Sequence, residues 1–241
     1  MGIQKSELSA TPISKITSYN REMDMTDIRW TGSTQTWKQV QEKIRRRLRV
    51  QPIGPLPRFV GACDCAFSTD GKRIRASAVV YDRLEHRLIE QTYTLQNCEV
   101  PYIPTFLSFR EIPALLNVLQ KLEHPYSVLL VDGQGVAHPR RCGIATHLGV
   151  LLDIPTVGCA KSRLIGTYEE PGPRKGDYSE LKEDSETIGW VLRTRERVKP
   201  VFLSVGHRTD LASCYKLVLD CCTHYRLPEP LRQADRLSKF H

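Results

Sequence analysis

The sequence predicts an α/β fold whose mixed sheet, an antiparallel meander followed by parallel strands, is flanked by helices. Three β-rich segments, 58–68, 73–82 and 86–95, are joined by links so short that neighbouring strands must run antiparallel. After them, helical and strand-like segments alternate, which favours parallel strands connected by helices. One of these strands, 128–131, is apolar throughout, as buried parallel strands are.

Composition limits the kind of protein. With 241 residues, the chain is long enough for one domain with a substantial core. Its 35 Lys and Arg outnumber its 27 Asp and Glu, and a formal net charge of +8 favours a polyanionic partner such as nucleic acid. Since no apolar run is long enough to span a membrane, we expect no membrane partner.

The cysteines help to predict the cellular compartment of the protein. Eight cysteines are scattered along a chain that lacks a secretory apolar region, which fits reduced thiols better than disulfides. We therefore expect a cytoplasmic protein, also present in the nucleus if the source is eukaryotic, that is not secreted.

The first element of the domain is a basic helix. Residues 1–35 are polar and lack periodicity, so we interpret them as a flexible or loosely docked extension, with the single domain spanning 36–241. The helix is predicted from apolar residues at helical spacing, namely Trp37, Val40, Ile44 and Leu48. Its Lys and Arg face is either solvated or is a face that contacts phosphate or another partner.

The later elements follow from periodicity and turn residues. The meander leads into a loop over 101–107. The predicted elements after it are a helix over 109–122, a strand ending at Asp132, a helix over 143–152, a strand near 155–158, strands over 188–195 and 201–205, and helices over 210–225 and 230–237. The stretch 171–185, rich in Pro, Gly and charges, is predicted to be a surface loop.

An acid follows the apolar strand 128–131. Asp132 is succeeded by Gly133 and Gly135, and in open α/β sheets ligands bind at the carboxyl ends of strands. Asp-Gly is also a common turn pair. The stretch taken alone is compatible with a site or a simple turn.

A second acid lies on the first strand. The predicted strand order brings Asp64 close to Asp132, and two adjacent carboxylates repel each other unless a cation such as Mg²⁺ or Mn²⁺ neutralises them. Cys63 and Cys65 flank Asp64 and point to the opposite face of the strand, into packing. A carboxylate in such an apolar strand is costly unless it is paired, hydrogen-bonded or metal-bound.

Three further residues are candidate site residues, and each of them could instead have a structural or solvated role. Glu111 is a third acidic ligand, the end of a capping box that starts at Ser108, or both. Asp235 is either a fourth acid or a solvated helix residue, and Lys161 either holds a phosphate or is solvated. Several acids around one or two Mg²⁺ ions, with cations nearby, suit phosphodiester hydrolysis.

Several motifs, in order, resemble those of the endonuclease V family, inosine-directed nucleases with an RNase H-like fold. The resemblance covers about residues 36–237. The motifs are Gly61-Ala62-Cys63-Asp64, Pro101-Tyr102-Ile103-Pro104 with Phe106 to Glu111, Asp132-Gly133-Gln134-Gly135 with Ala137 to Arg141, Gly143-Ile144-Ala145, Pro155 to Gly158 with Ala160-Lys161-Ser162, Ser204 to His207, and Pro228-Glu229-Pro230.

The resemblance implies a role for each matching acid and base. Asp64, Glu111 and Asp132 match the metal-binding acids, and Asp235 matches a fourth position near the metal. Two further matches, His138 and Lys161, are expected near the scissile phosphate, which completes a catalytic set of Asp64, Glu111, Asp132, His138, Lys161 and Asp235.

The resemblance also implies how the base is bound. Tyr102 matches the wedge that fills the space left by the extruded base, a role that suits an aromatic ring on a proline-stiffened loop. The positions expected to line the base pocket are Leu107, Gly133, Ile144 and Gly158. Thr105 stands where the family usually has Gly, so it adds a branched side chain at the pocket edge.

The implied activity is a Mg²⁺-dependent, or Mn²⁺-dependent, cut at the second phosphodiester bond 3′ to inosine or deoxyinosine, leaving 3′-hydroxyl and 5′-phosphate ends. The substrate is DNA, RNA or both, and we expect a monomer. Two alternatives remain open: a protein that binds inosine or a nucleic-acid structure without catalysis, and an RNase H-like nuclease of relaxed specificity.

Overall fold

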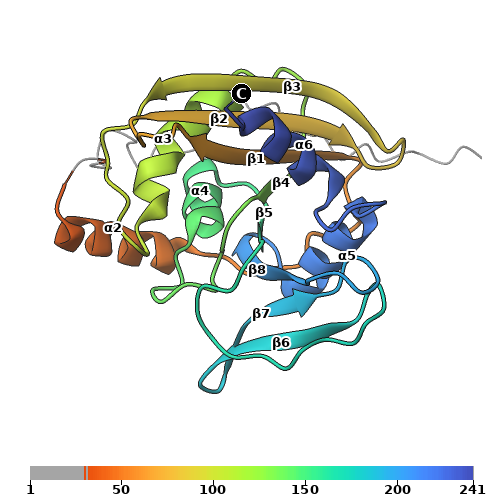
Figure 1. Cartoon of the computed structure of the whole chain (residues 1–241). Helices are drawn as coiled ribbons and strands as arrows, with labels where there is room; N and C mark the ends of the chain where they lie inside the picture. The colour runs from red at the N-terminus through yellow and green to blue at the C-terminus, as the bar shows by residue number, and fades with distance from the viewer. Residues whose placement is uncertain (1–29, 31, 241) are drawn as a thin grey trace, which may run out of the picture.

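The computed structural model describes residues 30 and 32–240, and these form a mixed sheet with helices on both faces (Figure 1). The sheet of these residues has eight strands in the order β3-β2-β1-β4-β5-β8-β7-β6. The predicted fold class is thereby confirmed.

The first half of the sheet matches the expected order. β1 (Phe59–Phe67), β2 (Arg73–Asp82) and β3 (Arg87–Asn97) form the antiparallel meander. β4 (Val128–Val131) then pairs with β1 in parallel, and β5 (Thr156–Ala160) pairs with β4 in parallel. The carboxyl ends of β1, β4 and β5 therefore lie at one edge of the sheet.

The second half contains a strand that the sequence analysis missed. β8 (Val201–His207), β7 (Glu186–Leu192) and β6 (Tyr178–Glu183) continue the sheet beyond β5, and each of them is antiparallel to the strand before it in the sheet. β6 lies inside the stretch predicted to be a loop, so that prediction was wrong. As an edge strand, β6 fully buries one side chain, Leu181, and so lacks the apolar alternation that reveals a strand.

Five helices of the described residues cover the two faces of the sheet (Figure 1). α3 (Leu107–Leu119) and α4 (Ile144–Leu152) pack on one face, with α2 (Thr34–Arg47) beside α4. α5 (Leu211–Cys221) and α6 (Glu229–Ser238) pack on the other. α5 ends before Tyr225, where we expected its end, because the backbone becomes extended at Cys222.

Each face of the sheet has its own apolar core, and β1 contributes alternate residues to both. Val60 and Ala62 lie in the core under α5 and α6. Cys63 lies in the core under α3 and α4, and Cys65 packs against it, as predicted. The side chain between them, Asp64, therefore faces the side covered by α6.

α2 packs as the amphipathic pattern predicts. It buries Trp37, Gln41 and Ile44 and exposes Lys38 and Lys43. The extension predicted over 1–35 lies mostly outside the described residues. None of the helices described here is both long and apolar enough to cross a membrane.

Candidate active site

Strand pairing brings two of the predicted acids together. Cys63 pairs with Val131 across β1 and β4, so Asp64 and Asp132 follow side by side at the same edge of the sheet. The backbone N–H of Asp132 donates to the carbonyl oxygen of Cys63 at 3.2 Å, which fixes this register. The sheet itself therefore places the two carboxylates.

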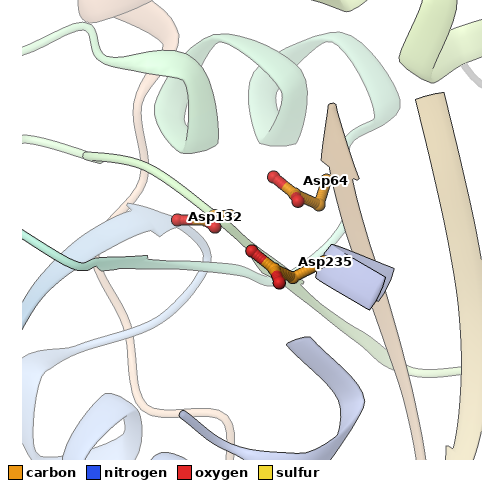
Figure 2. Close-up of side chains that lie close together, drawn as sticks. All are labelled: Asp64, Asp132 and Asp235. Carbon is orange, nitrogen blue, oxygen red and sulfur yellow. The ribbon is translucent and has the colours of Figure 1, made fainter. Parts of the chain in front are cut away.

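The third acid of the cluster comes from α6. Figure 2 shows Asp64, Asp132 and Asp235 directed toward a common space, each from a different element. One carboxylate oxygen of each lies within 4.8 Å of the others, a spacing that could hold a metal ion. Ser238, one turn after Asp235, donates from Oγ to Asp64 Oδ2 at 3.0 Å and so ties the end of α6 to β1.

Glu111 stands apart from this close cluster. It lies on α3, which packs on the opposite face of the sheet from α6, and it is 8% exposed. Burial, and then the charges of Asp64 and Asp132, raise the pKa of Glu111 well above its usual value. Its carboxyl group is therefore within electrostatic reach of the cluster without being among its close members.

The capping-box interpretation of Glu111 was wrong. α3 begins at Leu107, and its N-cap residue, Phe106, makes no side-chain hydrogen bond. Glu111 consequently lies in the second turn, beyond the orphan amide groups that a capping box satisfies. Its buried position has no role in starting the helix.

Lys161 connects two of the clustered acids. Its Nζ lies 2.5 Å from Asp132 Oδ2 and 2.5 Å from Asp235 Oδ1. Burial alone would lower the pKa of Lys161, but the two carboxylates outweigh burial and raise it. Lys161 thus compensates part of the charge of the three acids, and Lys239 Nζ lies 2.7 Å from the other oxygen of Asp235.

The pKa of Asp64 reflects the negative charge that remains uncompensated in the cluster. Burial and the charge of Asp132 raise the pKa of Asp64 to about 7, while Lys161 and Ser238 act against this rise. Burial also raises the pKa of Asp132. Asp235 differs, since the hydrogen bonds from Lys161 and Lys239 outweigh its burial and lower its pKa. The cluster carries more negative charge than its own residues neutralise, which favours a bound cation.

A cavity of about 330 Å³ adjoins the cluster and shares Asp132 and Lys161 with it. Four residues predicted to bind the substrate line this cavity, namely Tyr102, Leu107, Gly133 and Ile144. Tyr102 is 65% exposed, so its ring is available to a ligand. His138 and Thr105 also contribute to the walls.

Gly158 lies behind the cavity wall. A Cβ atom there would come within 2.5 Å of the Gly135 backbone nitrogen, so glycine lets the loop after β4 pack against β5. Gly133 has a φ of +149°, and a Cβ atom there would come within 2.5 Å of Ile144 Cγ2. The two glycines shape the loop that carries Asp132.

His138 is held by protein groups on both ring nitrogens. Its Nε2 lies 3.0 Å from the carbonyl oxygen of Thr105, and its Nδ1 accepts from the Arg140 backbone N–H at 3.2 Å. Burial lowers the pKa of His138 to about 4, so the ring is neutral near pH 7. Here His138 holds the loop before α3, and the role near the scissile phosphate stays a prediction.

Sequence reasoning missed two residues that support the site. Gln134 donates from Nε2 to the carbonyl oxygen of Ser162 at 2.9 Å and so joins the loop after β4 to the loop that carries Lys161. Ser238 was also missed. Gln134 lies between Gly133 and Gly135 in a motif shared with the family, and this position could have indicated its role. No local sequence feature indicates the role of Ser238, because its partner Asp64 is far away in the chain.

The fold and the carboxylate cluster, together with the family match, define the class: this is a hydrolase of phosphodiester bonds with an RNase H-like α/β fold. The model of the family described as Endonuclease V matches residues 38–236. The chain belongs to the endonuclease V family, as its motifs predicted.

Relatives and solved structures agree. The chain is 43% identical over 210 residues to an endonuclease V of Alkalilimnicola ehrlichii, covering 87% of this chain and 92% of the relative. The crystal structure of endonuclease V from Streptomyces avermitilis is 38% identical, with a TM-score of 0.83 and coverage of 87% and 93%. A Ciona intestinalis endonuclease V, 31% identical with a TM-score of 0.73 and coverage of 84% and 93%, was solved with a DNA containing an inosine followed by a ribo-adenosine.

Proposed function

We propose that this protein is a Mg²⁺- or Mn²⁺-dependent endonuclease that recognises inosine or deoxyinosine in nucleic acid. It hydrolyses the second phosphodiester bond on the 3′ side, leaving 3′-hydroxyl and 5′-phosphate ends. The observation that carries the proposal is that Asp132 belongs both to the acidic cluster and to the wall of the cavity. A nucleotide whose base is held in the cavity would therefore have its neighbouring phosphates close to the acids, and the family resemblance implies that the cut falls on the 3′ side.

The donor set fits a hard divalent cation. Three carboxylates lie within 4.8 Å of one another, and oxygen ligands are those that Mg²⁺ and Mn²⁺ prefer. Lys161 Nζ already bridges Asp132 and Asp235, which indicates that this position favours positive charge. We assign Asp64, Asp132 and Asp235 to the ion, with Glu111 as the predicted further acid. When bound, the ion supplies Lewis-acid activation of water and of the phosphate.

The other residues bind and orient the substrate. Lys161 offers a positive charge to a phosphate at the rim of the cavity, and it is partly exposed. The exposed ring of Tyr102 can stack on the neighbour of the extruded base, which offsets the loss of base stacking. Gly133 lets the base approach the backbone of the loop that carries Asp132.

An incision assay with Asp132→Asn tests the catalytic part. This variant keeps the shape of the cavity wall but removes a negative charge from the cluster. We expect incision of an inosine-containing oligonucleotide to fall by about a hundredfold or more, because metal positioning contributes several kcal/mol to such reactions. Asp220→Asn, on α5 and paired with Arg83, is the matched control and should cut like the wild type. Equal cutting by the wild type and Asp132→Asn would refute the assignment.

The choice of nucleic acid is tested separately. Matched single-stranded and duplex DNA and RNA, each with one inosine, are incubated with the protein and Mg²⁺ or Mn²⁺, and the cut is mapped. Incision one nucleotide beyond inosine is expected, because this is the position that the resemblance to the endonuclease V family implies. Comparable cutting of adenosine and inosine substrates would favour a nuclease of relaxed specificity.

A further inference from the structure

Thr105 has an unusual backbone conformation at the edge of the cavity. Its φ is +69°, in the left-handed region that L-residues with branched side chains rarely adopt. The other non-glycine residues with positive φ in the described part of the chain are Asp, His or Arg. Thr105 is thus the β-branched exception, and surrounding groups must hold it in place.

Three side chains hold the Thr105 backbone through its carbonyl oxygen. Gln41 Nε2 donates to this oxygen at 3.0 Å, His138 Nε2 lies at 3.0 Å, and Arg140 Nη2 donates at 2.9 Å. The three partners are joined to one another. Arg140 Nε donates to Gln41 Oε1 at 2.5 Å, and the Arg140 backbone N–H donates to His138 Nδ1 at 3.2 Å.

The Thr105 side chain is fixed as well. Arg140 Nη2 donates to Thr105 Oγ1 at 2.6 Å, and the Arg140 guanidinium lies 4.4 Å from the centre of the Phe106 ring. Because the hydroxyl is held, the methyl group on the same carbon cannot rotate to another position without breaking a charge-assisted hydrogen bond. Thr105 therefore forms a rigid part of the cavity wall.

We propose that Thr105 is a specificity-determining residue whose clamped side chain limits the size of the base that the cavity admits. The inference rests on the proposed function and deepens it: the favoured substrate is a purine no larger than hypoxanthine, and bases with an added group on the ring are excluded. Gln41, His138 and Arg140 act as positioning residues, because they prevent Thr105 from moving aside.

The test compares bases that differ by one group. Three thymidylate oligonucleotides each carry one other base: hypoxanthine, guanine or 1-methylhypoxanthine. Guanine adds an amino group at C2, and 1-methylhypoxanthine adds a methyl group at N1. For wild type, Thr105→Gly and Thr105→Ser we measure kcat/KM for incision, and Kd in EDTA, where no metal-dependent cutting occurs. Glycine adopts the required φ freely, and serine keeps the hydroxyl but lacks the methyl group.

For at least one enlarged base, we expect both variants to raise kcat/KM relative to hypoxanthine by about tenfold and to lower Kd relative to hypoxanthine by a similar factor. The reason is that one methyl-sized group in a pocket changes discrimination by about that factor. His86→Gly is the matched control, because His86 also has a positive φ but is exposed on the β2–β3 turn. This control should keep the wild-type ratios.

The outcomes separate this inference from the proposed function. Unchanged base ratios in both Thr105 variants, with hypoxanthine still bound, would overturn the role of Thr105. Absence of incision by the wild type on every substrate would overturn the proposed function alone, since the Kd ratios still report on Thr105. Thermal unfolding of each variant verifies that it is folded at the assay temperature.

Discussion

At the scale of single residues, burial controls the charge of two histidines. His147 is fully buried on α4, where it stacks on Trp30 with ring centroids 5.9 Å apart and lies edge-on to Phe109. Its Nδ1 lies 3.0 Å from Ser108 Oγ, and its Nε2 is buried without a hydrogen-bond partner. Burial lowers the pKa of His147 to about 3, just as it lowers that of His138.

The lowered pKa of His147 predicts that acidification weakens the contribution of this residue to stability. Above pH 6.5 the ring of His147 is neutral in both the folded and unfolded states, so its contribution is fully present. As the pH falls from 6.5 toward 3, the unfolded chain takes up a proton that the folded chain does not. We expect the contribution of His147 to the unfolding free energy to fall by about 1.4 kcal/mol per pH unit in this range. The raised pKa values of Asp64, Asp132 and Glu111 act in the opposite direction, so the effect of His147 is measured as a difference between the wild type and a variant.

The variant His147→Phe tests this dependence. Urea unfolding of the wild type and the variant is measured from neutral pH down to about pH 4.5, well inside the range in which this linkage acts. The variant should lose less stability on acidification, because its ring cannot take up a proton. His86→Asn, at an exposed turn position, serves as the control. Parallel curves for His147→Phe and wild type would contradict the prediction.

At the scale of elements, α6 completes the site by docking on the sheet. Leu231 is 1% exposed and lies in the core under α5 and α6. Ser77 on β2 donates from Oγ to the carbonyl oxygen of Ala234 at 2.7 Å, next to Asp235. The position of Asp235 therefore depends on the packing of the whole helix.

Leu231→Ala tests this dependence. We expect about 3 kcal/mol of destabilisation, as for other buried leucines, and a loss of incision at temperatures where the variant is still folded. Leu181→Ala on β6 removes an equally buried side chain from another core, and it should destabilise the protein without reducing incision. If both variants lost incision in proportion to stability, α6 would have no special role.

At the scale of the whole molecule, the net charge of +8 attracts the protein to a polyanion. We expect the affinity for an inosine-containing single strand to fall by at least about tenfold between about 50 and about 200 mM salt, as for about three phosphate contacts. Fluorescence anisotropy at a series of salt concentrations measures this slope. An oligonucleotide with uncharged methylphosphonate linkages should show little dependence, and equal slopes would argue against phosphate contacts.

Much of this protein was predictable from local sequence patterns. The short links required the antiparallel meander, and the apolar run before Asp132 indicated a buried strand. A carboxylate on the first strand, between Cys63 and Cys65, indicated a site because an isolated buried charge is costly. The ordered motifs identified the family. These features follow from periodicity, turn chemistry and burial cost, all of which involve residues close together in the chain.

The sequence also predicted that Asp64 and Asp132 lie close together, but only the tertiary structure decided which other groups join them. Strand alternation turns Asp64 toward α6, so Asp235 joins the close cluster while Glu111 approaches from the other face. The bridging position of Lys161 and the clamp on Thr105 likewise join residues that are distant in the chain. The physical reason is that helix docking depends on the packing of complementary faces. A local pattern shows that a face is apolar but does not specify its partner.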